Sequence, residues 1–427
     1  MHLTGSELSA SDLLRVCRDL AWSEIAAMPG IRRRLGHRLS SLQDQTLLDW
    51  SADGLALDSL ACMQLATAAA VWCNAYDAGF GDLFLAKRTA QDWSKAMKRA
   101  RSGGTNGFTF STSGSTGKRQ HIRHTEDSLM DEARSWAQVF QASALPVRRL
   151  ITLVPCHHIY GFIWGVLLPK VLGVPVIEAS HEALPELLAG DLLVGVPDQW
   201  QWLSGSVRAV LGPVQGVTST APMPGSVHRK LTTAEGAMPA GLSRLLQIYG
   251  STQTGGIAWR DSPDTPYTLA PGRYRSADGG VELMLPGGAV VPMALQDEVR
   301  WTGTSQFELL RRTDSCVQVG GHNVSTDWVR GQLLAYPAVK DASVRLDTAA
   351  ALPRLKAFVV LESPADESQQ AGLQEWALDN LPWYAALSSI CYGAELPRNA
   401  MGKLTDWSIQ NLTVMQRGTA GKLYLPP

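Results

Sequence analysis

The sequence lacks the features of a membrane-spanning, secreted or nucleic-acid-binding protein. Its longest apolar run, residues 60–73, is interrupted by Gln64 and Thr67 and falls short of the ~20 residues that a transmembrane helix needs. The 38 Lys and Arg residues nearly balance the 39 Asp and Glu residues, so no global field would attract nucleic acid. Residues 1–15 lack the apolar core of a secretory signal. We therefore expect a cytoplasmic protein with no membrane span and no nucleic-acid partner.

Cysteine is also scarce, and its spacing argues against two kinds of site. The six cysteines lie far apart, and no two of them form a Cys-x-x-Cys pair. A disulfide framework or a structural zinc site is therefore not expected, and reduced thiols fit a cytoplasmic location. Among the nine histidines, only His157 and His158 are adjacent. Neighbouring side chains on a strand point to opposite faces, so this pair does not have the spacing of metal ligands.

What the sequence does contain is the composition of a large globular protein. Its 427 residues are 45% hydrophobic and 18% charged, which predicts several folded units. Residues 1–102 show helical periodicity and predict an all-helical N-terminal domain. Residues 103–312 alternate short apolar strands with amphipathic helices, which predicts an α/β core with a partly parallel sheet. Residues 313–427 predict a small α+β domain.

Individual elements can be assigned within these domains from capping residues and periodicity. In the N-terminal domain we expect helices that begin after Ser9 or Ser11, at Asp58 and after Thr89. In the core we expect strands at 150–154, 174–177 and 192–196, a helix at 126–140 and a β-rich stretch at 267–310. In the C-terminal domain we expect an alternating stretch at 317–324, helices at 328–336 and 372–380, and a strand at 357–361.

The most informative segment is the loop that follows the β-like run at Phe108. Residues 111–118 read Ser-Thr-Ser-Gly-Ser-Thr-Gly-Lys. Glycine lets backbone N–H groups approach an anion, and the hydroxyls add donors, so this composition is typical of phosphate binding. It is not a Walker A loop, which has glycine in place of Thr112 and Ser or Thr in place of Arg119. Taken alone, such a loop can equally be a plain solvent-exposed hairpin.

Three further motifs follow in an order that resembles one enzyme superfamily. Thr112–Gly117 resembles the phosphate loop of the AMP-forming adenylating enzymes, which include acyl-CoA synthetases, aryl acid ligases and adenylation domains of peptide synthetases. Tyr249–Gly255 resembles their Tyr-Gly-x-Thr-Glu motif, Arg312–Asp314 their hinge, and Pro397–Lys403 their Pro-x-x-x-x-Gly-Lys motif. The resemblance implies a shortened α/β adenylating-enzyme core with a small, mobile α+β C-terminal domain.

The resemblance also implies a reaction. Enzymes of this superfamily join a carboxylate to the α-phosphate of ATP, release pyrophosphate and pass the acyl group to a thiol. Two like unit charges about 4 Å apart repel by ~4 kcal/mol at an effective dielectric of about 20, so the site must supply positive charge. By resemblance, Lys403 supplies this charge, and Thr252 acts with it. The implied nucleotide-binding residues are Thr112, Ser113, Gly114, Ser115, Thr116, Gly117, Lys118, Tyr249, Gly250, Ser251, Thr252, Asp297 and Arg312.

Within this set the resemblance implies separate roles. Thr252 and Gln253 would bind Mg²⁺; Gln253 stands where the superfamily has glutamate, and an amide oxygen coordinates without the charge. Tyr249 would stack on adenine. Asp297, 15 residues before Arg312, would bind the ribose hydroxyls. Asp314 would be the hinge about which the C-terminal domain rotates between the two steps.

The segment Pro155–Gly161 resembles the superfamily's segment beside the acyl pocket. His158 or Tyr160 would line that pocket, and a strand end packed in the core is the alternative for both. Trp164 and Met223 are weaker candidates that we expect in the core.

The sequence departs from the superfamily at several positions that bear on catalysis. Arg119 and Gln120 replace the Pro-Lys that ends the phosphate loop, and Gln253 replaces the glutamate. Arg311 replaces the hinge glycine, and the lysine and glutamate expected after the hinge are Gln318 and Ser325. These departures leave a catalytically weakened adenylate-binding or carrier-docking protein as the alternative to an active ligase, and Lys403 favours the ligase.

The N-terminal residues add a second, weaker resemblance. Leu55–Leu60 is similar to the Asp-Ser-Leu motif of acyl carrier proteins, in which the serine carries 4'-phosphopantetheine. Ser59 would be the modified serine, and a helix cap at Asp58 or Ser59 is the alternative. The compact length and this helix resemble the short ligases of aryl polyene-type pathways. We therefore expect an ATP- and Mg²⁺-dependent ligase of an aromatic acid, with a carrier-protein thiol preferred over coenzyme A and a fatty acid–CoA ligase as a rival.

Overall fold

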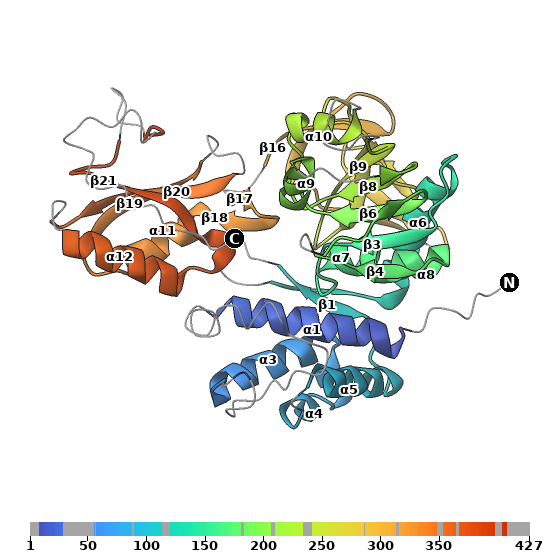
Figure 1. Ribbon diagram of the computed structural model, residues 1–427, viewed down its shortest axis with the longest axis horizontal. Helices are drawn as coiled ribbons and strands as arrows, with labels where there is room; N and C mark the ends of the chain where they lie inside the picture. The colour runs from blue at the N-terminus through green and yellow to red at the C-terminus, as the bar shows by residue number, and fades with distance from the viewer. Residues whose placement is uncertain are drawn as a thin grey trace. The chain divides into compact units, whose positions relative to one another are not determined.

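The computed structural model describes most of the chain and divides it into two compact units. The described residues are 8–28, 55, 57–87, 89–112, 120–180, 183–205, 210–233, 241–285, 287–312, 316–347, 353–363, 367–397 and 404–407. The larger unit contains most described residues up to Arg312, and the smaller contains those from Cys316 to Trp407 (Figure 1). Their positions relative to one another are not determined, so each unit is described by itself.

A nine-stranded mixed sheet forms the centre of the larger unit. Its strand order is β15-β16-β11-β10-β9-β8-β6-β3-β4. The strands are β3 (Arg149–Thr152), β4 (Val176–Glu178), β6 (Asp191–Gly195), β8 (Gln215–Thr218), β9 (Arg244–Ser251), β10 (Gly255–Arg260), β11 (Tyr267–Leu269), β15 (Asp297–Trp301) and β16 (Gln306–Arg312). Strands β4, β3, β6, β8 and β9 are mutually parallel, and the remaining pairs are antiparallel.

The central strands of the parallel half of the sheet are fully buried. Every residue of β6 and β8 is buried, as expected for parallel strands covered on both faces. The helical segments of this part are α6 (Glu126–Gln141), α7 (Ile159–Phe162), the π-helical segment η3 (Ile163–Leu167), α8 (Leu168–Leu172), α9 (Pro197–Ser204) and α10 (Gly225–Thr232). Helix α6 begins where Thr125 accepts a hydrogen bond from the backbone N–H of Ser128.

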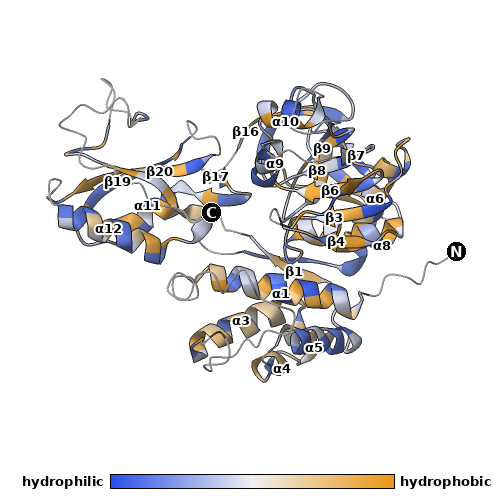
Figure 2. Cartoon of the chain, viewed as in Figure 1, coloured by the Kyte–Doolittle hydropathy of each residue, from blue (hydrophilic) through white to orange (hydrophobic). Residues whose placement is uncertain are grey.

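The N-terminal helices belong to this same unit. They are α1 (Ala10–Ala26), α3 (Ser59–Trp72), η2 (Ala75–Ala78), α4 (Asp82–Leu85) and α5 (Ala90–Ser102). Hydrophobic and hydrophilic residues alternate along α1 (Figure 2). Trp72 at the end of α3 packs against Phe108, which follows α5 in sequence, and against Phe162 of α7, with ring centroids 4.6 and 5.4 Å apart. The helices thus share a core with the α/β part, and the predicted carrier-like domain over 1–102 is not confirmed.

Three small sheets complete the larger unit. They are the hairpin β1 (Phe108–Ser111) with β2 (His121–His124), the parallel pair β5 (Leu187–Leu188) with β7 (Val210–Leu211), and the meander β12 (Arg273–Arg275), β13 (Val281–Met284) and β14 (Val290–Met293). The hairpin is the one that positions the predicted phosphate loop, because that loop connects its two strands.

The smaller unit is a three-stranded sheet with two helices and a hairpin. Its elements are β17 (Cys316–Val319), β18 (His322–Ser325), α11 (Thr326–Leu334), β19 (Val339–Asp347), β20 (Arg354–Leu361), α12 (Glu367–Asn380), η4 (Trp383–Ala385) and β21 (Leu387–Tyr392). Alternate residues of β20, such as Ala357 and Val359, share one hydrophobic core with Leu333 of α11 and Leu373 of α12. Phe358 belongs to a separate cluster, as the two-residue period of a strand requires.

Several predicted elements are confirmed, and some are corrected. Helices begin after Ser9, Asp58, Thr89 and Thr125 as expected. The stretch 317–324, predicted as one alternating segment, is instead two strands joined at Gly320 and Gly321, both of which have positive φ. None of the six cysteines forms a disulfide. Among the described residues, no helix is long and apolar enough to cross a membrane.

Candidate active site

The predicted phosphate loop is closed at its base by the β1–β2 hairpin. Ser111 pairs with His121 across this hairpin, and the Ser111 hydroxyl lies 3.1 Å from His121 Nδ1. Gly107 has a φ of +84°, and a Cβ there would meet the carbonyl oxygen of His124 at 2.0 Å. Thr112 directly follows β1. The other predicted loop residues, Ser113 to Lys118, lie outside the described residues.

The Tyr-Gly-Ser-Thr motif forms the end of β9 and the turn that leads into β10. Ser251 and Thr254 close this turn: the Ser251 N–H donates to Thr254 Oγ1 at 3.1 Å, and the Thr254 N–H donates to Ser251 Oγ at 3.3 Å. Thr252 and Gln253 occupy the tip, where Thr252 is half-buried and Gln253 is exposed. The turn therefore presents the two predicted magnesium ligands at its end.

A buried carboxylate is hydrogen-bonded to the backbone at the end of this turn. Glu132 of α6 accepts hydrogen bonds from the Gly256 N–H at 2.7 Å and from the Trp136 indole N–H at 3.1 Å. Burial raises the pKa of Glu132, although the charge of Arg273 opposes the rise. Gly255 has a φ of +64°, and a Cβ there would lie 1.9 Å from Glu132 Oε2. Only glycine fits between the turn and this carboxylate.

The hairpin and the turn are joined by a contact that the sequence did not predict. His124, the last residue of β2, has its Nε2 2.7 Å from the carbonyl oxygen of Thr252. This hydrogen bond ties the base of the predicted phosphate loop to the predicted magnesium-binding turn. The two segments are 128 residues apart in sequence, so local patterns gave no signal for it.

The predicted adenine and ribose residues also meet. The Tyr249 hydroxyl donates to Asp297 Oδ2 at 2.9 Å. Asp297 lies opposite Arg312 in the β15–β16 ladder, so the backbones of these two predicted nucleotide-binding residues are neighbours. Gln296, the residue before Asp297, donates to Gln253 Oε1 at 3.0 Å. The predicted hinge residue Asp314 lies outside the described residues.

The two predicted acyl-pocket residues lie after the carboxyl end of β3. His158 is half-buried and precedes the first residue of α7. The Tyr160 hydroxyl donates to the carbonyls of Gly195, at 3.1 Å, and Val217, at 3.2 Å. Burial raises the pKa of Tyr160 well above its usual value, so it stays a neutral donor. Tyr160 therefore links the carboxyl ends of β6 and β8 through hydrogen bonds.

The remaining two pocket candidates are core residues, as expected. Trp164 is 1% exposed and packs against Trp136, with ring centroids 5.2 Å apart. Met223 is 3% exposed within a hydrophobic cluster of the larger unit.

These segments share one edge of the sheet. His158 and Tyr160 follow β3, and the turn with Thr252 follows β9. Because β3, β6, β8 and β9 are parallel, their carboxyl ends lie at the same edge. In open α/β sheets, ligands bind outside the carboxyl ends of the strands. This edge is therefore the candidate active site.

The comparisons with known proteins identify the family. The family model described as AMP-binding enzyme matches residues 34–300. A 4-coumarate–CoA ligase from Halorhodospira halophila is 35% identical over 403 residues, which cover 93% of this chain and 99% of that protein. The chain belongs to the AMP-binding enzyme family.

Two further similarities agree with this assignment. A 4-coumarate–CoA ligase from Cereibacter sphaeroides is 35% identical over 371 residues, covering 85% of this chain and 86% of that protein. The structure of an o-succinylbenzoate CoA synthetase from Bacillus subtilis has a TM-score of 0.52 at 18% identity, covering 74% of this chain and 70% of that one. The resemblance to the adenylating superfamily is confirmed, and so is the prediction of an AMP-forming acid–thiol ligase. The closer likeness to aryl polyene-type ligases stays a prediction.

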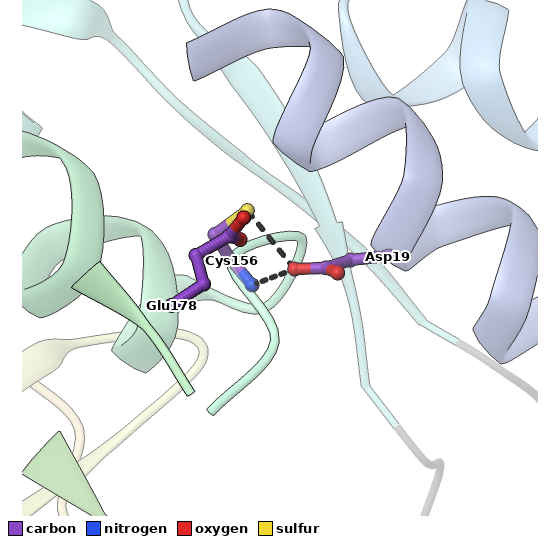
Figure 3. A group of neighbouring side chains, drawn as sticks. All are labelled: Asp19, Cys156 and Glu178. Carbon is purple, nitrogen blue, oxygen red and sulfur yellow. Dashed lines mark hydrogen bonds between the residues drawn. The ribbon is translucent and has the colours of Figure 1, made fainter. Parts of the chain in front are cut away.

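In this AMP-binding enzyme, helix α1 contacts the candidate active site through a partly buried group of side chains that the sequence did not predict (Figure 3). Asp19 accepts hydrogen bonds from the backbone N–H of Cys156, at 2.7 Å, and from its thiol, at 3.1 Å. Burial raises the pKa of both Asp19 and Cys156. Cys156 precedes His157 and His158, so α1 holds the loop that carries the predicted pocket residues.

The same group includes Glu178, but its charges do not favour a metal ion. Asp19, Cys156 and Glu178 offer ligand atoms within 4.8 Å of one another. However, Glu178 already binds Arg15 at 2.9 Å and Arg18 at 2.6 Å, and these guanidinium groups lower its pKa against the opposing effect of burial. Two fixed positive charges would repel a divalent cation. The group is better explained as an ionic contact between α1 and the ends of β3 and β4.

Two other predicted site residues, Ser59 and Lys403, are not among the residues that the structure brings together at this edge of the sheet. Ser59 is exposed at the first residue of α3, and the Asp58 carboxylate caps the helix by accepting from the Ala61 N–H at 2.8 Å. A prosthetic group on Ser59 therefore stays a prediction. Lys403 lies outside the described residues, whereas Leu404 to Trp407, which follow it, are described.

Proposed function

We propose that the enzyme activates an aromatic carboxylic acid of the 4-coumarate type with ATP and transfers it to the thiol of coenzyme A. The observation that carries this proposal is the 35% identity to a 4-coumarate–CoA ligase over 93% of the chain. Identity at this level over nearly the whole chain supports a related substrate. It also favours coenzyme A over the carrier-protein thiol that the sequence alone suggested.

The proposed reaction has two steps. In the first, a carboxylate oxygen of the acid attacks the α-phosphorus of ATP; a new P–O bond forms, the α–β phosphoanhydride bond breaks, and pyrophosphate leaves. In the second, the coenzyme A thiol releases its proton to water and its sulfur attacks the acyl carbon. The C–S bond forms as the acyl C–O bond to AMP breaks. The products are the acyl thioester, AMP and pyrophosphate.

The residues at the sheet edge suit the nucleotide part of this reaction. In the proposal, Thr112 and the loop through Lys118 bind the phosphates, and Asp297 binds the ribose hydroxyls. The Tyr249 ring stacks on adenine while its hydroxyl orients Asp297, a role that their 2.9 Å hydrogen bond supports. The resemblance assigns Arg312 to the same nucleotide, and the backbone of Arg312 lies opposite that of Asp297 in the ladder.

Lys403 and Thr252 carry the remaining proposed roles. An ammonium group on a flexible stem offsets the repulsion between the carboxylate and the α-phosphate and stabilises the charge that builds up in the transition state. The Thr252 hydroxyl oxygen and the Gln253 amide oxygen are uncharged ligand atoms for a metal ion. They would hold a Mg²⁺ ion, which binds oxygen ligands. When bound, that ion neutralises phosphate charge.

The location of the reaction follows from its chemistry and from the thiols. ATP and coenzyme A are intracellular substrates, and none of the six cysteines is bridged. We therefore place the enzyme in the cytoplasm.

The test is thioester formation with a panel of acids. The wild-type enzyme, ATP and Mg²⁺ are incubated with 4-coumarate, benzoate, acetate or a long-chain fatty acid, with coenzyme A or a phosphopantetheine-loaded carrier protein as acceptor. We expect 4-coumaroyl-CoA as the main product, and its loss in Lys403→Ala. Preference for the fatty acid or for acetate would contradict the aromatic substrate. Transfer to the carrier protein alone would contradict coenzyme A as acceptor.

A further inference from the structure

In the smaller unit, a buried lysine holds the segment that directly follows Lys403. Lys356 of β20 is 7% exposed. Its ammonium group donates to the carbonyl oxygen of Trp407 at 2.6 Å and pairs with the carboxylate of Asp406 at 3.0 Å. It also lies 5.3 Å from the centre of the Trp407 ring. One ammonium group thus contacts the backbone, a charge and a ring within two consecutive residues.

Other contacts fix the same short segment on both sides. The Trp407 ring is 6% exposed and packs edge-on against Phe358 of β20, with centroids 5.7 Å apart. Arg345 of β19 donates to the carbonyl oxygen of Leu404 at 3.0 Å. The N–H of Thr405 donates to the carbonyl oxygen of Pro397 at 2.9 Å. This last bond joins Pro397, the first residue of the Pro-x-x-x-x-Gly-Lys motif, to the described segment that follows the motif.

The choice of lysine at this position calls for an explanation beyond stability. A lysine is almost never buried unless it is paired, because removing its charge from water is costly. An apolar side chain of similar length would cover Trp407 without that cost. What only the ammonium group provides is a directed bond to the backbone at Trp407 and an ionic contact to Asp406. Lys356 therefore fixes where the chain leaves the motif.

We propose that Lys356 is a positioning residue for the catalytic lysine Lys403. The inference rests on the proposed function, in which Lys403 acts in acyl-adenylate formation. Lys403 is bonded to Leu404, so holding the segment from Leu404 to Trp407 restricts where the Lys403 backbone can lie. A displacement of about 1 Å in a reacting arrangement can reduce the rate on the order of 100-fold. The anchor matters only to the step that uses the Lys403 ammonium group.

The test separates the two half-reactions. Acyl-adenylate formation is measured by pyrophosphate release with 4-coumarate and ATP, and thioester formation is measured from chemically prepared 4-coumaroyl-AMP and coenzyme A. In Lys356→Met we expect adenylate formation to fall by roughly 10- to 100-fold, with thioester formation little changed. Lys340→Met is the matched control, because Lys340 is exposed on the neighbouring strand β19. It should leave both half-reactions at the wild-type rate.

A double variant then tests whether Lys356 acts through Lys403. If it does, Lys356→Met adds no further loss of adenylate formation to Lys403→Ala, whereas two independent effects would multiply. Arg345→Leu provides a second variant that perturbs the same segment from a half-buried position; we expect the same selective loss, smaller in size.

Two results would overturn the inference while the proposed function stands. One is an equal loss of both half-reactions in Lys356→Met and in Arg345→Leu, which indicates a purely structural role. The other is a wild-type rate of adenylate formation in both variants. If the wild-type enzyme forms no adenylate from any acid of the panel, the proposed function itself fails, and the inference falls with it.

Discussion

Tyr249→Phe examines how the structure prepares Asp297 to bind the ribose. The Tyr249 hydroxyl donates to Asp297 Oδ2 at 2.9 Å, and both residues are half-buried. The substitution removes the donor and retains the ring that stacks on adenine in our proposal. Asp297 keeps its charge but loses the contact that fixes its orientation.

The size of the effect follows from that one hydrogen bond. A hydrogen bond to a charged group contributes about 1.5–3 kcal/mol. Because both side chains are partly exposed, water replaces part of the lost bond, and we take a net loss of about 1 kcal/mol. Since about 1.4 kcal/mol corresponds to a tenfold change, KM for ATP should rise roughly fivefold. The turnover number kcat should hardly change, because a ribose contact is made equally in the ground state and the transition state.

The assay is pyrophosphate exchange as a function of ATP concentration at saturating acid, repeated with 2',3'-dideoxy-ATP. If the hydroxyl acts through Asp297 on the ribose, the variant and the wild type should have the same KM for the dideoxy nucleotide. Tyr274→Phe is the control, because Tyr274 is an exposed tyrosine on β12. An equal rise of KM for both nucleotides, or no rise for ATP, would refute the reasoning.

Three further substitutions test features around the sheet edge. Gly255→Ala places a Cβ 1.9 Å from a carboxylate oxygen of Glu132, at a residue with a φ of +64°. We therefore expect the free energy of unfolding, measured with urea, to fall by about 2 kcal/mol or more. An unchanged midpoint of urea unfolding would contradict the close packing. Thr220 has a φ of +78°, which is strained for a β-branched residue, so Thr220→Gly should be at least as stable as the wild type, and a loss of more than about 1 kcal/mol would disprove the strain. Asp19→Ala leaves the backbone N–H of Cys156 without its acceptor, at a cost of about 1–3 kcal/mol in the free energy of unfolding. It should also raise KM for the acid more than KM for ATP. If the variant has the wild-type KM for the acid and for ATP, this assignment is contradicted.

Local signals in the sequence predicted many of the elements. The capping residues Asp58 and Thr89 each precede a helix in the structure, because a side-chain oxygen there satisfies an N–H of the first turn. Asp297 was chosen from its spacing of 15 residues before Arg312, and the structure pairs the backbones of these two residues across β15 and β16.

Long-range contacts explain what the sequence did not reveal. The Asp19–Cys156 contact spans 137 residues, and the His124–Thr252 contact spans 128. A single sequence carries no local pattern for such pairs. Strand β19 was also missed, because only some of its residues, such as Ala342 and Val344, are buried and polar residues separate them.

The central claim is that the nucleotide lies at the carboxyl edge of the parallel strands, beside Tyr249 and Asp297. A crystal structure of the enzyme with a non-hydrolysable 4-coumaroyl-adenylate mimic tests it most directly. We predict the adenine against the Tyr249 ring, the ribose hydroxyls on Asp297 and the acyl group near His158. A mimic bound elsewhere, or an edge filled by the protein's own side chains, would contradict the account.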